Sequence, residues 1–265
     1  MPMNMQPLNI PRIFQFLLAV SIVLTTQSCG NAKADSSNDL VVEEQADSAI
    51  TADSKQATFK IDVPTDGSRV LVDSVMALIN REMYNACEDC VHLDEGVTSF
   101  SPEEMFTDDG KQFVKNYMKK YKVLIQDSLW KTYFDFTLKM EAQTKKYVTY
   151  GMEHVHCGGS CSSQKYYYTF DKRDGHQIQE IISHDNLVRF LGDHPEYATI
   201  QADAWSGTPG WKFYPDDKIT EYYFGLLDDH FSLVIKGVGN HYLIVDIPYN
   251  KISSYLSPEV QELVK

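Results

Sequence analysis

The chain has 265 residues, and 43% of them are hydrophobic, a proportion typical of folded globular proteins. This composition excludes a fully disordered chain, a collagen-like fibre and a membrane protein with several spans. The 24 Lys and Arg residues against 37 Asp and Glu residues give a formal net charge of -13. That balance argues against a nucleic-acid partner, because phosphate binding requires clustered cationic side chains.

The N-terminal segment has the pattern of a targeting signal. Ten of the twelve residues Ile13–Leu24 are apolar, a run too short to span a bilayer but suited to the core of a signal peptide. Ser28 and Cys29 follow, and a small residue directly before a cysteine at this point is typical of a bacterial lipobox. We therefore expect a signal peptide over residues 1–28 and a lipoprotein whose Cys29 carries palmitate-type acyl chains. A plain secretory signal with an incidental cysteine is the alternative.

This lipid would make the membrane a partner of the protein and place it in the cell envelope. Several acyl chains on one cysteine hold a protein on a membrane durably, whereas one chain does not. Gly30, rather than an aspartate, follows the cysteine. This favours the outer membrane if the cell is Gram-negative.

Residues 29–56 are predicted to form an acidic, flexible tether. They are rich in Ala, Ser, Asp and Glu and contain no aromatic residue. Such a segment cannot bury enough apolar surface to offset the entropy lost on ordering. The folded part is therefore expected to run from about residue 57 to residue 265.

The first part of this region predicts a strand and then helices. Residues 57–63 alternate between apolar and polar, as a half-buried strand does. Apolar residues spaced as on one helical face predict an amphipathic helix over about 71–85. Ser101 to Glu104 form a capping box, and a longer helix with one apolar face is expected over about 113–125.

The middle of the chain predicts antiparallel strands. In the run 133–142, Phe134 and Ala142 are expected on one face with the apolar residues between them, and the polar residues on the other. Two further strands, over 147–156 and 165–170, lead to a turn at Asp174-Gly175.

The last part combines short helices and strands. Ser183 is expected to cap a helix that continues to about Leu191, and Ser257 to cap the last helix. Strands are expected at three ranges: 219–227, 231–235 and 242–247. The whole pattern predicts an α+β fold, an antiparallel sheet with helices packed on one face, in two intimately joined lobes over 57–145 and 146–265.

Five short motifs occur in order in the second lobe: Tyr167–Asp171, Asp174-Gly175, Phe231–Leu233, Val245–Tyr249 and Tyr255-Leu256. In this order they resemble the RsiV-type domain of bacterial cell-envelope proteins. The first lobe, with its run from Phe134 to Tyr150, is similar to the companion domain found in RsiV and beside the catalytic domain of the deacetylase PdaC. RsiV is a transmembrane anti-sigma factor whose exterior domain binds lysozyme.

The resemblance implies a ligand-binding domain, with lysozyme or another cationic protein as the ligand. Only twelve residues precede the apolar run Ile13–Leu24. We therefore expect no sigma factor among the partners.

Four cysteines besides Cys29 form two close pairs: Cys87 with Cys90, and Cys157 with Cys161. Export to an oxidising space favours disulfides, preferably within each pair, although cross-pairing is open. The second interpretation is a zinc site, made of the four cysteines or of the second pair with His154 and His156, because the spacings resemble those of ligands. A redox Cys-x-x-Cys is the third.

Known catalytic motifs are missing from the sequence. It contains no nucleophile elbow, no phosphate-binding loop and no dinucleotide-binding glycine run. We therefore expect no enzymatic activity and no cofactor. A metal-dependent envelope enzyme using His154, His156, Cys157 and Cys161 is an alternative.

Aromatic residues near predicted turns and loops are candidate ligand-binding residues: Tyr166, Tyr168, Trp205 and Trp211. Exposed aromatic rings can stack on sugars or anchor a protein partner. A second hypothesis is therefore an accessory module that binds peptidoglycan or another glycan. The alternative is that these rings pack the sheet.

Overall fold

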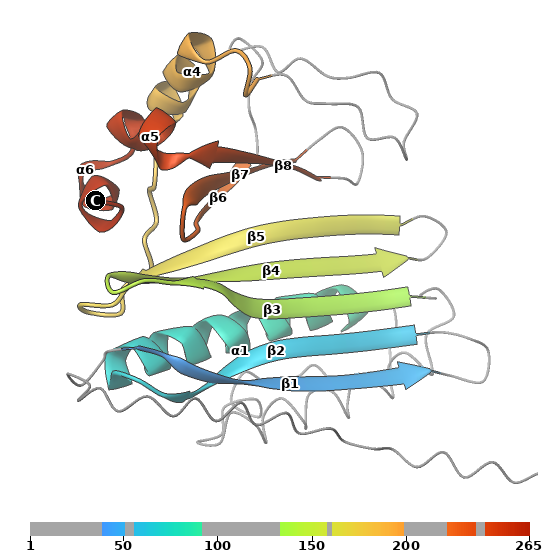
Figure 1. Cartoon of the computed structure of the whole chain (residues 1–265). Coiled ribbons are helices and arrows are strands. Elements are labelled where there is room, and N and C mark those ends of the chain that lie inside the picture. Colours follow the sequence, from blue (N-terminus) through green and yellow to red (C-terminus); the bar gives the residue numbers. More distant parts are fainter. Residues whose placement is uncertain (1–38, 51–55, 92–132, 158–160, 199–221, 237–241) are drawn as a thin grey trace, which may run out of the picture. The chain divides into compact units, whose positions relative to one another are not determined.

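The computed structural model describes residues 39–50, 56–91, 133–157, 161–198, 222–236 and 242–265 (Figure 1). The fold is α+β, as predicted. A first sheet has the strand order β1-β2-β3-β4-β5, and a second has the order β6-β7-β8. Among the described residues, no helix combines the length and the hydrophobicity that crossing a membrane requires.

The first sheet contains β1 (Val41–Ile50), β2 (Gln56–Asp66), β3 (Tyr133–Gln143), β4 (Tyr147–Cys157) and β5 (Cys161–Asp171). The second contains β6 (Tyr222–Leu226), β7 (His230–Lys236) and β8 (Tyr242–Pro248). The helices are α1 (Arg69–Val91), α4 (His184–Asp193), α5 (Tyr249–Ile252), the 3-10 turn Ser253–Tyr255 and α6 (Pro258–Leu263). The predicted helix starting near Ser101 and the helix over 113–125 lie outside the described residues.

One strand pair departs from the expected antiparallel arrangement. β2 and β3 are parallel, whereas the other neighbouring strands in both sheets are antiparallel. A parallel pair requires a crossover of a dozen residues or more. The long connection between β2 and β3, which includes α1, supplies that length.

The tether prediction is wrong for residues 39–50. Residues 41–50 form β1, which pairs with β2 along its whole length. Leu40 is 2% exposed, and its backbone N–H donates to Oε1 of Gln143 over 2.7 Å. A polar segment can therefore be ordered by backbone pairing and one buried leucine, which average composition does not reveal.

The helix α1 packs on one face of the first sheet and makes the first hydrophobic core. Its buried residues are spaced as predicted: Leu71, Val75, Leu78, Ile79 and Met83. They pack on strand residues such as Phe59, Phe134 and Phe136. The predicted amphipathic helix is confirmed and extends to Val91.

The strand β3 changes face at Glu141. Met140 and Ala142 pair with successive residues of β4, so Glu141 is the extra residue of a β-bulge. Phe134 belongs to the first core, whereas Ala142 belongs to the second core together with Tyr147. The prediction that Ala142 shares the face of Phe134 is wrong, because one inserted residue reverses the alternation.

The helices α4 to α6 pack against the second sheet and form the second core. The hydroxyl of Ser183 accepts the backbone N–H of Asn186 at 3.3 Å, and Ser257 caps α6 in the same way. Both predicted caps are confirmed. In α4, Leu187 and Phe190 are fully buried.

The two sheets are joined through the β4–β5 hairpin. The hydroxyl of Thr149 donates to the backbone oxygen of Leu226 over 2.6 Å, and the hydroxyl of Tyr147 donates to that of Leu227 over 2.7 Å. Because β4 and β5 pair within the first sheet, the lobe boundary predicted at residues 145 and 146 falls inside one sheet.

Substitution of Gly225 is expected to destabilise this junction. A Cβ atom there would lie 2.6 Å from Cγ of the buried Tyr167 ring, closer than real Cβ atoms approach a neighbour, so the ring or the strand would have to shift. We expect Gly225→Ala to lower the free energy of unfolding by about 1–3 kcal/mol, measured by urea denaturation.

Gly192 in α4 provides the control, because a Cβ atom built on Gly192 would have no other atom within 4 Å. Gly192→Ala should therefore raise stability by roughly 0.5–1 kcal/mol, and equal effects of the two substitutions would contradict this account.

Candidate functional site

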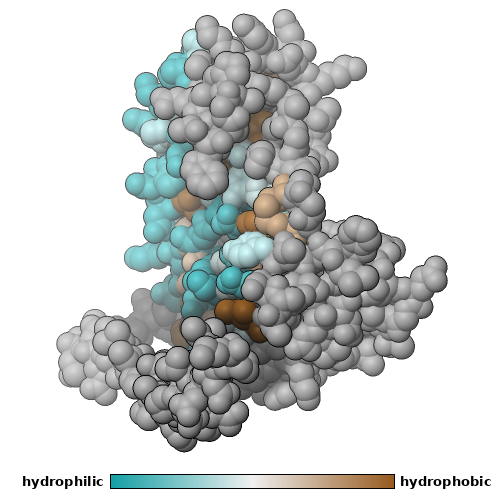
Figure 2. All heavy atoms as spheres, turned by 90° about the vertical axis from the view of Figure 1, so that its right-hand side faces the viewer, coloured by the Kyte–Doolittle hydropathy of each residue, from teal (hydrophilic) through white to brown (hydrophobic). Residues whose placement is uncertain are grey.

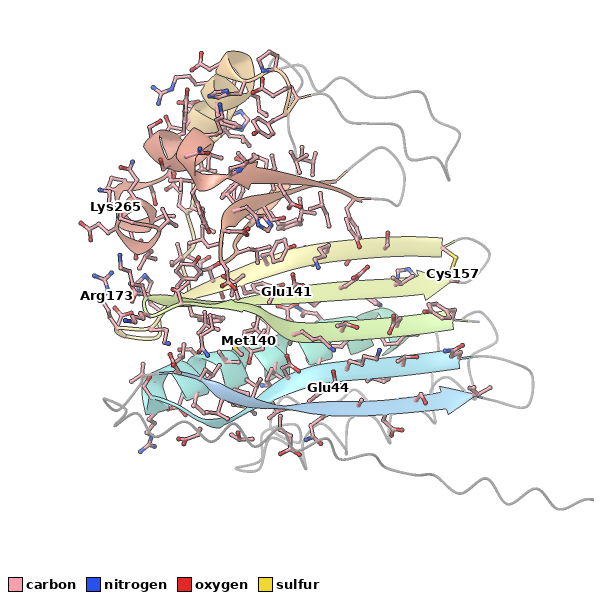
Figure 3. The ribbon with its side chains drawn as sticks, in the orientation of Figure 1. Glu44, Met140, Glu141, Cys157, Arg173 and Lys265 are labelled. Carbon is pink, nitrogen blue, oxygen red and sulfur yellow. A yellow bond between two sulfur atoms is a disulfide. The ribbon has the colours of Figure 1, made fainter. Side chains whose placement is uncertain are left out.

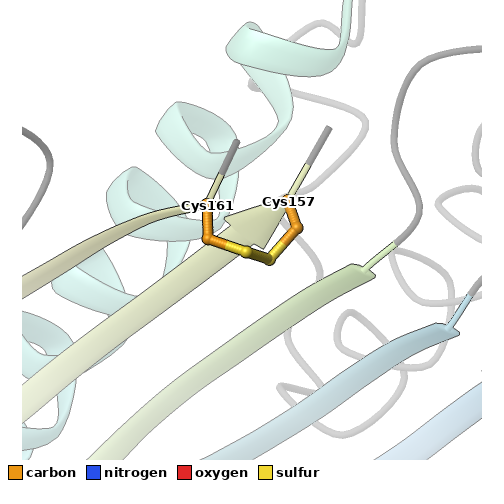
Figure 4. The surroundings of a disulfide bond; sticks show 2 residues. All are labelled: Cys157 and Cys161. Atoms are coloured by element: carbon orange, nitrogen blue, oxygen red, sulfur yellow. A yellow bond between two sulfur atoms is a disulfide. The ribbon is translucent and has the colours of Figure 1, made fainter. Parts of the chain in front are cut away.

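The tip of the β4–β5 hairpin carries a disulfide. Cys157 and Cys161 are directly paired in the strand register and their sulfur atoms are bonded (Figure 4). This is the local pairing preferred from the sequence. Cys87 and Cys90 lie in α1, but their side chains are outside the described residues, so their pairing stays a prediction.

The disulfide bears on the zinc hypothesis. His154 is 4% exposed, with its ring centroid 4.8 Å from that of Phe134 and 5.2 Å from that of His156. Both histidines thus belong to the α1-facing side of β4. A cysteine binds zinc as its thiolate, whereas the sulfur atoms of Cys157 and Cys161 are bonded to each other. A site built from these four residues would therefore require reduction of the bond.

The candidate tyrosines of β5 are packed rather than freely exposed. Tyr168 lies beneath the guanidinium group of Arg81, 5.3 Å from ring centroid to Cζ, and burial raises the pKa of its hydroxyl. The ring of Tyr166 meets that of Tyr223 edge-on at 4.3 Å. Both tyrosines pack against the first core. This agrees with the alternative hypothesis that these rings pack the sheet rather than bind a ligand. The other two candidates, Trp205 and Trp211, lie outside the described residues.

The face of the first sheet opposite α1 is rich in charge, and we call it the open face. Its charged residues follow from the register: Glu44, Lys60, Asp62, Asp135, Lys139, Glu141, Glu153 and Lys165. Five carboxylates thus stand against three lysines. Within the described residues, the principal contacts of the second sheet fall on β4 and β5. On β1 to β3, Glu44 and Lys60 are exposed, whereas Asp62, Asp135 and Lys139 are partly buried.

Two ion pairs cross the open face. Lys139 of β3 pairs with Glu44 of β1, and Nζ of Lys165 on β5 lies 2.8 Å from Oε1 of Glu141 (Figure 3 labels both glutamates). A Cβ atom at Gly151 would fall 2.0 Å from the same oxygen of Glu141. The glycine therefore leaves the space in which the bulge residue reaches across β4 to the lysine.

Burial alters the protonation of two carboxyl groups on this face. It raises the pKa of Asp62, although the N–H donated by Met140 and the charge of Lys139 act in the opposite direction. Burial also raises the pKa of Asp135, partly countered by Lys60. Figure 2 shows hydrophilic residues over most of the described surface at the strand ends, with small separate hydrophobic areas.

A second polar cluster links the turn after β5 to α6. Nδ1 of His176 lies 2.5 Å from Asp174, and its Nε2 lies 2.6 Å from Glu259. Ligand atoms of Asp171, His176 and Glu259 lie within 4.8 Å of one another, a spacing that would suit a metal ion. Because Asp171 already binds Arg173 through two carboxylate oxygens, we interpret this cluster as an ionic clamp.

Comparison with known proteins identifies the fold. No protein-family model matches the chain, and no curated protein matches it. A crystal structure of a DUF3298 family member from Bacteroides fragilis matches 85% of this chain and 96% of its own, with a TM-score of 0.53 and 13% identity. The chain shares the fold of that protein. A DUF3298 family protein from Pseudomonas aeruginosa covers 84% of this chain and 97% of its own, with a TM-score of 0.46 and 10% identity.

The disulfide is expected to make a modest contribution to stability. It closes a loop of only a few residues, so the double substitution Cys157→Ser with Cys161→Ser should cost roughly 2 kcal/mol in the chain-entropy model. Chemical denaturation of the oxidised protein and the variant measures this difference. The two proteins should become equally stable once the disulfide of the parent is fully reduced. A difference in stability that remains after reduction would show that the serine substitutions change stability by something other than loss of the bond.

The clamp predicts a pH dependence of stability. The hydrogen bond to Asp174 raises the pKa of His176, burial opposes this, and Glu259 raises the pKa further. The contribution of His176 to stability is then complete below its unfolded pKa of about 6.5 and is lost as the pH rises through the higher folded pKa. The difference in denaturation midpoint between the parent and His176→Gln should therefore shrink from pH 6 to pH 9. A difference that stays constant would contradict the clamp.

Proposed function

We propose that the protein is exported, is anchored by lipid at Cys29, and acts in the cell envelope as a ligand-binding protein without catalysis. The signal-like segment 1–28 and the small residue before Cys29 support the anchor. The bonded pair Cys157–Cys161 supports export, because such bonds persist in oxidising compartments.

The proposed ligand is a cationic protein of the lysozyme type. The observation that carries this is the excess of carboxylates over lysines on the open face, within a chain of formal charge -13. Complementary charge speeds encounter and selects partners more than it adds affinity. The resemblance to RsiV-type domains supports the same class of partner.

Intact-mass measurement of the protein purified from its own cells tests the anchor. We expect a chain that begins at Cys29, heavier than its sequence by the added acyl groups. Reduction should then add the mass of two hydrogen atoms for each disulfide. Material that begins at Met1 with no lipid would overturn the proposed anchoring.

Neutralising the open face tests the partner. We expect a triple variant with Glu44→Gln, Asp135→Asn and Glu153→Gln to bind lysozyme roughly tenfold more weakly at low salt, because the field that steers association is reduced. Surface plasmon resonance at two salt concentrations measures the association rate. At high salt, where exposed charges are screened, the parent should associate with lysozyme only slightly faster than the triple variant.

The matched control removes the same charge elsewhere. Asp73 on α1, Asp185 on α4 and Glu196 after α4 are exposed and lie away from the open face. The variant with Asp73→Asn, Asp185→Asn and Glu196→Gln should bind like the parent. Equal losses in the two variants would assign the effect to net charge alone, and absence of lysozyme binding by the parent would overturn this ligand.

An accessory module for cell-wall glycan is the second candidate function. The feature that favours it is an aromatic cleft beside β5, separate from the open-face carboxylates. Sedimentation with purified peptidoglycan tests this function independently of lysozyme binding.

A further inference from the structure

A cleft of about 410 Å³ opens where the two sheets meet. Its lining comes from three segments: Tyr167–Thr169 of β5, the extended chain Gln177–His184, and Tyr222–Phe224 of β6. The extended chain is held to β5 by the backbone N–H of Ile178, which donates to the oxygen of Thr169 over 2.8 Å. β5, the extended chain and β6 thus each contribute to the cleft, and its lining includes the buried Ile178, Ile181 and Ile182.

Aromatic rings form the β6 wall of this cleft. Tyr222 and Phe224 have ring centroids 5.0 Å apart, and Phe224 rests on the buried Phe231 at 5.3 Å. The imidazole of His184, which also lines the cleft, is stacked with Tyr222 at 6.1 Å between ring centroids, and its Nδ1 lies 3.4 Å from the hydroxyl of Tyr222. The rings of Tyr222 and Phe224 are only partly buried, so a ligand can reach them without unfolding the wall.

The opposite wall supplies hydrogen-bonding groups. Gln177, Gln179 and Glu180 line it, and the last two are exposed. The carboxylate of Glu180 lies near enough to Tyr222 to raise the pKa of its hydroxyl, after the larger effect of burial. A ligand between the walls would therefore meet a ring on one side and amide and carboxylate oxygens on the other.

The charges of the lining restrict the ligand class. Among the described lining residues there is no Lys or Arg, His184 is the one side chain that can become cationic, and the carboxylate of Glu180 would repel an anionic group such as phosphate. Neutral amides, hydroxyls and one carboxylate beside aromatic rings suit a molecule with an apolar face and many hydroxyl groups. A pyranose ring has that chemistry.

We propose that the cleft between β5, residues 177–184 and β6 binds an uncharged pyranose of a glycan chain. Tyr222 provides the stacking platform and Glu180 accepts hydrogen bonds from the sugar hydroxyls. The proposal rests on the second candidate function and names its site. It is independent of the open face and of a cationic partner.

Titration of the purified protein with chitotetraose and, separately, cellotetraose tests the site by NMR. We expect saturable shifts in the amides of 177–184 and 222–224. Glu180→Gln keeps the shape of the side chain and should weaken binding by at least about threefold, whereas Tyr222→Ala should weaken it by about tenfold or more. If circular dichroism shows that Tyr222→Ala is unfolded, the sugar affinity of Glu180→Gln alone tests the cleft assignment.

Two control variants lie outside the cleft. Glu262→Gln makes the same chemical change on α6, and Tyr242→Phe removes a hydroxyl that donates to Glu153 on the open face. Both should bind the sugars like the parent. Absence of saturable binding, or equal affinity in the parent and Glu180→Gln, would overturn the cleft assignment. If peptidoglycan still sediments every cleft variant with undiminished affinity, the glycan function stands and this site is wrong.

Discussion

The β4–β5 hairpin is the element on which the rest of the structure depends, because each of its faces belongs to a different hydrophobic core. Val148 and Tyr150 face α1 and the first core, whereas Tyr147 faces the second. Strand alternation makes this division strict, since neighbouring side chains point to opposite sides. A slip of one residue in the hairpin register would therefore expose parts of both cores.

This shared hairpin also determines where the open surfaces lie. The second sheet covers the part of β4 and β5 near Thr149 and Tyr167, where Gly225 allows close contact. On the open face Glu44 and Lys60 therefore stay exposed, and Asp62 and Asp135 are only partly buried. The cleft arises at the edge of the same contact, where β6 passes the free side of β5. Both proposed binding surfaces are thus consequences of one junction.

Local sequence patterns predicted most of the elements and little of their arrangement. The alternation in 133–140 and the caps at Ser183 and Ser257 are local signals, and each matches the structure. The strand β1 was missed because its order comes from a partner strand rather than from its own apolar content. The bulge at Glu141 was missed for a similar reason, because the extra residue is defined only by the register with β4.

The sequence also does not show which of the candidate residues form a binding site. Aromatic character makes Tyr166 and Tyr168 candidates, but the alternation of β5 turns both side chains toward the first core. The cleft residues Glu180 and Tyr222 come together from segments about forty residues apart, and neither carries a motif of its own. Sequence spacing cannot reveal such a site, because its walls are brought together only by the packing of one sheet on another.

The outer strand β1 has a further consequence for how copies of this protein behave when crowded. A strand at the margin of a sheet offers its backbone to any similar strand it meets, and acidic side chains along it oppose such pairing by mutual repulsion. Glu43, Glu44 and Asp47 give β1 that protection. These charges therefore disfavour the pairing of two copies through this strand.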